Sequence, residues 1–150
     1  MKKLIVLIAI LFSTVAYSQI KLPQQFKIKP KEIHVGNVLT DGKYTFSSYP
    51  YAHDGFELDD IIANADRFFS KKPLKTKDSL YIWTGKSGDT YYYTILLPES
   101  LFEFQVSSKK NDEVFSYYSI WLLEQIREKR KLPSDYPDGN LYLTDYDDNQ

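Results

Sequence analysis

The sequence predicts an α+β domain in which an antiparallel sheet of about five strands carries two helices. Two patterns support this prediction. Apolar and polar side chains alternate in a hairpin at residues 31–49 and in a three-strand meander at residues 79–106, the period of a strand with one buried face. Apolar residues recur at every third or fourth position in residues 56–70 and 112–131, the period of an amphipathic helix.

The chain begins with a pattern typical of a secretory signal peptide. Residues 1–3 are a short basic start, residues 4–12 are all apolar, and Ala16 and Ser18 have the small-x-small spacing that precedes a cleavage point. We expect residues 1–18 to be removed after Ser18, which predicts a periplasmic or secreted protein. An apolar run of this length is far short of the ~20 residues that span a bilayer, so we expect no membrane insertion after cleavage.

Composition excludes several classes of function. The chain has no cysteine, so a disulfide, a thiol nucleophile and a thiolate metal site are all impossible. The formal charge of the full chain is −1, and loss of Lys2 and Lys3 with the signal peptide takes it to about −3. This mildly acidic balance argues against nucleic acid as a partner, because such a partner requires a basic surface.

The first part of the mature chain is expected to be an extended leader followed by a hairpin. Residues 19–30 contain two prolines and are predicted as the leader, outside an α+β domain that spans residues 31–144. In the hairpin, Asp41-Gly42 is predicted as a two-residue turn, which places Leu39 opposite Tyr44. Residues 49–55 are a connector that contains several aromatic residues.

The first predicted helix covers about residues 56–70. Asp54 followed by Glu57 resembles a capping pair at its start. Its apolar residues lie on one side, so we expect it to pack that side on the sheet. Residues 71–78 are predicted to be a basic loop.

The meander is predicted from two turns that select the same buried face. Two-residue turns at Ser87-Gly88 and Pro98-Glu99 place Ile82 opposite Tyr93 and Tyr93 opposite Phe104. One face of the three strands is then apolar throughout. It collects Leu80, Ile82, Tyr91, Tyr93, Ile95, Phe102, Phe104 and Val106.

The second predicted helix covers about residues 112–131 and has a wide apolar surface. Its acidic start and basic end match the two poles of the helix dipole. A short strand is predicted at residues 141–143, and we expect residues 145–150 to form an acidic, disordered tail.

The opposite face of the meander supplies the candidate binding residues. It gathers three large aromatic side chains and several polar ones, whereas the wet side of an antiparallel sheet usually carries small polar and charged residues. These residues are Tyr81, Trp83, Tyr92, Thr94, Glu103 and Gln105. If the face is exposed, the rings suit a protein partner, or a glycan as the alternative. If the second helix or the tail covers it, the rings are core.

No catalytic, metal or cofactor site is assigned. His53-Asp54 could pair a base with an orienting carboxylate, with Ser47 or Ser48 as nucleophile, but such a triad is defined in space rather than by spacing. Glu103 and Glu99 are the acids best placed for glycosidase-type chemistry, which requires a cleft between them. Asp145 to Asn149 lacks the central glycine and closing glutamate of a calcium loop.

The sequence therefore predicts an exported, non-enzymatic protein that binds another protein through the aromatic sheet face. An inhibitor, an immunity-type protein and an envelope adaptor all fit this description. The alternative is a small cell-envelope hydrolase or glycan-processing enzyme that uses His53 or Glu103. A third reading is a self-associating domain that uses the apolar surface of residues 112–131.

Overall fold

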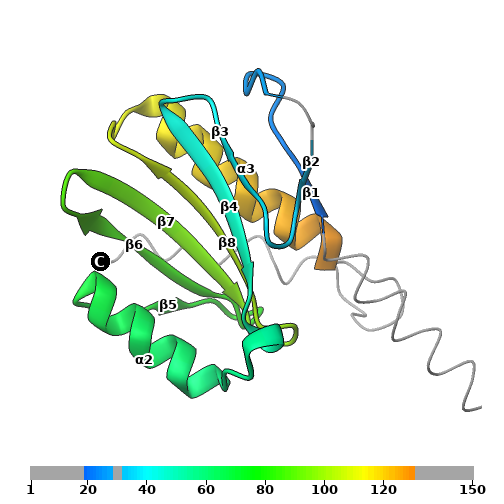
Figure 1. The fold of residues 1–150 in the computed structure, drawn as a ribbon, viewed down its shortest axis with the longest axis vertical. Helices are drawn as coiled ribbons and strands as arrows, with labels where there is room; N and C mark the ends of the chain where they lie inside the picture. The colour runs from blue at the N-terminus through cyan, green and yellow to red at the C-terminus, as the bar shows by residue number, and fades with distance from the viewer. Residues whose placement is uncertain (1–18, 29–31, 131–150) are drawn as a thin grey trace, which may run out of the picture.

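The computed structural model describes residues 19–28 and 32–130, and it has the predicted α+β class. Six antiparallel strands form one sheet in the order β3-β4-β8-β7-β6-β5 (Figure 1). These strands are β3 (Val38–Thr40), β4 (Tyr44–Pro50), β8 (Phe102–Ser108), β7 (Thr90–Leu97), β6 (Tyr81–Ser87) and β5 (Leu74–Lys75). The strand beyond the predicted five is β5, which lies in the segment that we predicted to be a loop.

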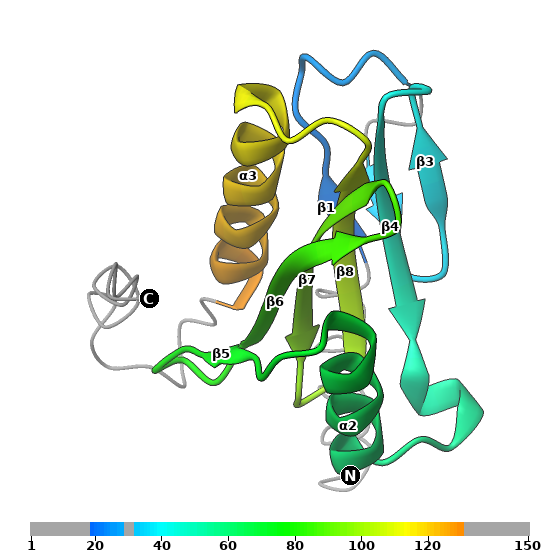
Figure 2. The same ribbon diagram turned by 90° about the vertical axis from the view of Figure 1, so that its left-hand side faces the viewer.

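Two helices cover opposite faces of this sheet (Figure 2). Helix α3 (Glu113–Arg130) packs on what we call the first face, and helix α2 (Leu58–Phe69) packs on the second. Both helices lie within their predicted ranges. Asp112 caps α3, because its Oδ1 accepts a hydrogen bond from the Phe115 amide at 2.9 Å.

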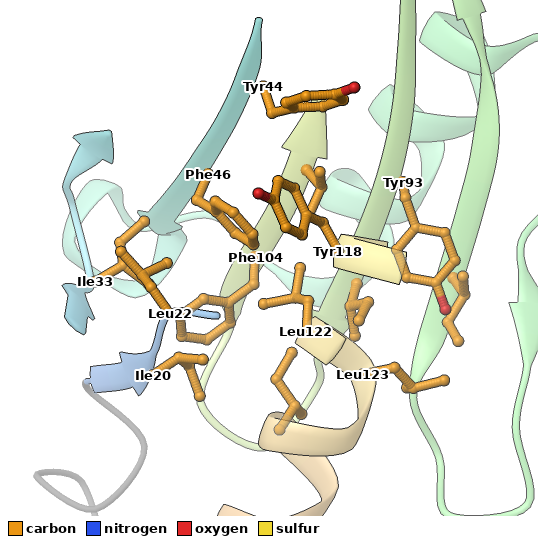
Figure 3. Close-up of a cluster of buried hydrophobic side chains, with 14 of the residues drawn as sticks. Ile20, Leu22, Ile33, Tyr44, Phe46, Tyr93, Phe104, Tyr118, Leu122 and Leu123 are labelled. Atoms are coloured by element: carbon orange, nitrogen blue, oxygen red, sulfur yellow. The ribbon is translucent and has the colours of Figure 1, made fainter. Parts of the chain in front are cut away.

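The predicted apolar face of the meander is confirmed as the first face. Six of its eight residues are buried and the other two, Tyr91 and Phe102, are partly buried against the same cluster. Tyr118 and Leu122 of α3 reach into this core, where the Tyr118 ring meets the Tyr44 ring edge-on at 5.2 Å between centroids (Figure 3).

Residues of the expected leader contribute to this core. Ile20, Leu22 and Phe26 are buried, and the Phe26 ring lies edge-on to Phe46 at 5.0 Å. Strand β1 (Gln19–Lys21) pairs with β2 (Glu32–His34) in a separate two-stranded sheet. The predicted first strand of the hairpin is therefore divided: β2 pairs with β1, and only β3 pairs with β4. The break falls at Gly36, whose φ of +94° favours glycine.

The predicted strand registers are wrong by two residues. Leu39 lies opposite Phe46, and Ile82 lies opposite Ile95, because glycine occupies the first position of each turn rather than the second. The turn residues are Gly42-Lys43 and Gly88-Asp89. The third turn is longer than predicted, since Leu97 pairs with Phe102. A shift of two preserves the period of a strand, so every side chain keeps its predicted face.

The predicted Asp54–Glu57 capping pair is also wrong. Asp54 ends a short 3-10 helix, η1 (Tyr51–Asp54), and accepts a hydrogen bond from the Tyr49 hydroxyl. Glu57 precedes α2, but its side chain makes no capping bond. Gly55, at a φ of +71°, turns the chain between the two helices. The predicted signal peptide at 1–18, strand at 141–143 and tail at 145–150 lie outside the described residues.

A cluster of four charged side chains fastens the end of α3 to the sheet. Arg127 Nε lies 3.2 Å and Arg130 Nη1 lies 3.4 Å from Asp78 Oδ2. Arg130 Nε also lies 2.8 Å from Glu99 Oε1. The Asp78 carboxylate is almost fully buried, so each guanidinium offsets part of its desolvation. The cluster joins α3 to the loop before β6 and to the turn after β7.

We expect Asp78→Asn to lower the free energy of unfolding by about 3 kcal/mol, because it removes the buried counter-ion of Arg127 and one of the two counter-ions of Arg130. Urea unfolding measures the loss. Asp89→Asn is the matched control, since the Asp89–Lys109 pair is exposed and screened by water. Equal, small losses in both variants would show that the cluster adds nothing to stability.

Candidate functional site

Trp83 does not stand in solvent as the sequence analysis required of a binding residue. Its side chain is 1% exposed and packs with Ile61 of α2 and Leu96 of β7. The indole Nε1 donates a hydrogen bond to Asp66 Oδ1 at 3.1 Å. The apolar stripe of α2 lies over this part of the second face, so Trp83 belongs to a second core. The covering element is the first helix, and not the second helix or the tail expected as the alternatives.

The two tyrosines of the predicted set border this second core and are half-buried. The Tyr81 ring stacks on Trp83 with centroids 6.3 Å apart. The Tyr92 ring meets Phe68 and Phe69 of α2 edge-on, at 5.4 and 6.2 Å. Both rings therefore use much of their surface in packing within the protein.

The polar residues of the predicted set also lie on the second face, toward the side of the sheet that α2 does not cover. Thr94 is buried, and its Oγ1 accepts a hydrogen bond from Gln105 Nε2 at 2.8 Å. Gln105 and Glu103 lie on β8, opposite Ser47 and Tyr49 of β4. These two residues of β8 are half-buried rather than covered. The open part of the second face is thus the part formed by β3, β4 and β8.

A groove of about 370 Å³ lies on this open part, and we call it the Glu103 groove. Three aromatic side chains and one carboxylate give it its chemical character. It is lined by Val38, Ser47, Ser48, Tyr49, Tyr51, Phe56 and Glu103. Its volume is near the lower end of the range of roughly 300–1,000 Å³ typical of ligand pockets, which suits a side chain or another small group.

The chain between β4 and α2 builds the aromatic wall of the groove. After Pro50 the chain turns into η1. The Tyr51 amide donates a hydrogen bond to the Leu101 carbonyl at 3.0 Å, which fixes η1 against the start of β8. The Tyr51 ring lies between the other two rings. Its centroid is 4.7 Å from that of Tyr49 and 5.8 Å from that of Phe56, at interplanar angles of 62° and 89°.

Among the described residues, Glu103 is the one acidic residue in the lining of this groove. Its Oε2 accepts a hydrogen bond from the Tyr51 hydroxyl at 2.8 Å. Burial raises the pKa of the Glu103 carboxyl, and the hydrogen bond from Tyr51 opposes this shift in part. The same burial and the nearby carboxylate raise the pKa of Tyr51, so its hydroxyl stays a donor at neutral pH.

Of the residues that form this groove, the predicted set contained only Glu103. Tyr49 and Tyr51 were missed because they lie in the predicted connector, where periodicity gives no indication of which way a side chain points. Phe56 was missed because it was assigned to the start of the predicted helix at residues 56–70. The signal that could have found them is the density of aromatic residues beside Pro50 and Gly55, in a segment too short to form its own core. Large apolar groups in such a segment either pack on the domain or stand exposed for a partner.

The acids considered for catalysis each make a hydrogen bond or an ion pair in the described part of the chain. His53 lies in η1, but its side chain is outside what is described, and His34 is exposed on β2. Glu99 is engaged with Arg130, and Asp54 accepts a hydrogen bond from Tyr49. Among the described residues, no group of three or more histidine, aspartate and glutamate side chains could hold a metal ion.

None of the helices described is both long and apolar enough to span a membrane.

No protein family, curated protein or solved structure matches this chain. The function is therefore inferred from the chemistry of the site itself.

We expect Trp83→Ala to lower the free energy of unfolding by about 3–5 kcal/mol, because it opens a cavity beneath α2 and leaves Asp66 without the indole donor. Denaturant unfolding measures the loss. Phe68→Ala is the control, because this α2 ring is half-exposed and its loss opens no closed cavity. A similar cost for both substitutions would contradict the packing of α2 described here.

The raised pKa of Glu103 predicts how stability depends on pH. The folded protein holds the proton of the Glu103 carboxyl more tightly than the unfolded chain does. The stability that this provides is present below the ordinary pKa of 4.5 and is lost as the pH rises through the pKa of the folded protein. The ionisable neighbours of Glu103 are Tyr51 on η1 and Tyr49 on β4, and both stay neutral in this range, while β7 presents Leu96.

Glu103→Gln is therefore expected to remove this decline. Between about pH 4 and pH 7, the difference in free energy of unfolding between the variant and the wild type should shift in favour of the variant. Urea unfolding at both pH values measures it. Glu113→Gln, at the exposed start of α3, controls for the change in net charge. A difference from the wild type that does not vary with pH would contradict the raised pKa.

Proposed function

We propose that this protein is an exported, non-enzymatic binding protein that recognises another protein through the Glu103 groove. The observation that supports the proposal is the exposure of large apolar side chains around an open groove. Val38 is 67% exposed, Tyr49 is 44% exposed and Phe56 is 39% exposed. Aromatic side chains that are already held in place lose little entropy on binding, which makes them frequent anchors of protein interfaces.

Export is part of the same proposal and follows from the signal peptide expected at residues 1–18. A periplasmic or extracellular inhibitor, immunity-type protein or envelope adaptor fits a small domain with this groove. The negative charge expected of the mature chain favours association with a basic partner. Of the binding residues predicted from the sequence, Glu103 and Gln105 belong to the proposed interface. Trp83 supports it from the core between the sheet and α2.

A hydrolase or glycan-processing enzyme is the second candidate, and one observation favours it. A half-buried glutamate with a raised pKa in an aromatic groove has the properties of a general acid. Glycosidase chemistry also requires a second carboxylate about 5 to 10 Å away on the other side of the bond. The lining of the groove contains one carboxylate, that of Glu103. We therefore favour binding over hydrolysis.

The proposal predicts that Tyr49→Ala and Phe56→Ala each weaken partner binding by about tenfold or more, because each removes an exposed aromatic anchor. To obtain the partner, a photo-crosslinking residue replaces Val38 in the full chain within its own cell envelope. The adduct is identified by mass spectrometry, and the purified partner is then titrated with each variant.

Two matched controls locate the interface. Tyr117→Ala removes a ring that is 41% exposed on α3, close to the exposure of Tyr49 and Phe56, and should leave affinity unchanged. A photo-crosslinking residue at Ile120, also on the exposed side of α3, should not capture the same protein. If Tyr117→Ala abolishes binding instead, or a second copy of this chain is captured at Ile120, the interface is the α3 face and the proposal is wrong.

A further inference from the structure

The Glu103 carboxylate differs in its neighbours from two other partly buried acids, Asp66 and Asp78. Asp66 lies 2.8 Å from Lys72 Nζ, and Asp78 lies between two arginines. Glu103, as far as the described residues show, has a neutral partner, the Tyr51 hydroxyl, and the groove lining contains no lysine or arginine. A half-buried carboxylate that keeps its charge without a counter-ion is costly, and a cation entering the groove would offset that cost.

The aromatic wall is suited to the same ligand. The three rings are not stacked in a column, because Tyr51 meets each neighbour at a steep angle. Such an arrangement turns the faces of neighbouring rings in different directions. The face of an aromatic ring attracts a cation within about 6 Å of its centroid, most strongly where water is partly excluded. The apolar stem of a lysine or arginine would also find apolar surface on Phe56 and Val38.

We propose that the Glu103 groove binds a lysine or arginine side chain of the partner protein, with the carboxylate of Glu103 as its counter-ion and the rings of Tyr49, Tyr51 and Phe56 as its walls. This inference rests on the proposed function and adds the chemistry of the group that is recognised. The ammonium or guanidinium donates to Glu103 Oε1, while Oε2 keeps its hydrogen bond from Tyr51. The acidic charge of the mature chain steers such a partner toward the groove.

The simplest test uses small probes on the full chain. N-acetyl-lysine methylamide and N-acetyl-arginine methylamide carry the proposed group, and N-acetyl-norleucine methylamide is a neutral probe of similar shape. NMR titration at concentrations up to tens of millimolar should move resonances of Tyr51, Phe56 and Glu103 with at least one basic probe. The neutral probe should bind about tenfold more weakly or not at all.

Charge and shape are separated by variants. Glu103→Gln keeps the size of the side chain and removes its charge, and it should weaken the basic probe about tenfold or more while leaving the neutral probe unchanged. Glu113→Gln removes one negative charge in the same way at a distant exposed site on α3 and should have no effect on either probe. Equal binding of basic and neutral probes, or no binding of a basic probe, would overturn the inference.

Partner binding measured with the same variants distinguishes failure of the further inference from failure of the proposed function. If Tyr49→Ala and Phe56→Ala weaken the partner but Glu103→Gln does not, the groove is the interface and its ligand is not a cation. If none of the three variants weakens the partner, the proposed function itself is wrong. If Glu103→Gln weakens the partner, replacing the partner's interface lysines and arginines one by one with methionine should identify one residue whose loss is not additive with Glu103→Gln.

Discussion

The packing of Phe69 of α2 on Trp83 of β6 decides which part of the second sheet face remains open. A side chain at Gly85 would crowd this contact, because a Cβ atom there would lie 3.0 Å from Phe69 Cδ1. Because Gly85 has no side chain, the Phe69 ring can approach the backbone of β6 there. The ring also stacks on Trp83, with 6.5 Å between centroids. Asp66, held by Lys72 and the Trp83 indole, fixes the same stretch of α2. With α2 held over β6 and β7, the strands on the other side of β8 keep an uncovered face.

The sequence was sufficient for the class of fold and for the division of side chains between the two sheet faces. The strand pattern has a period of two, and the wrong turn positions shifted each register by two, so Leu80, Ile82 and Phe104 were still assigned to the buried face. The turn positions themselves were not predictable from the dipeptides. Ser87-Gly88 and Gly88-Asp89 are both acceptable turns, and the choice depends on cross-strand packing of distant residues.

The sequence was not sufficient to say which helix covers which face. Both helices have an apolar side, and periodicity says nothing about the sheet face on which that side packs. Trp83 was therefore read as an exposed ring, although its burial depends on Gly85, Phe69 and Ile61 together. The groove was missed for a related reason. Tyr49, Tyr51 and Phe56 point to one place only because η1 and the Tyr51–Leu101 backbone bond bend the connector over β8.

The position of Glu103 on β8 is what makes a binding role physically reasonable. β8 is a central strand, paired with β4 on one side and β7 on the other, and its opposite face is packed by α3. The Asp78–Arg127–Arg130–Glu99 cluster holds the end of that helix to the sheet. The carboxylate therefore stands on a rigid base, with its hydrogen bond from Tyr51 already made. The site therefore loses little conformational entropy when a ligand enters. For this reason, even a single side chain of a partner can bind with useful affinity.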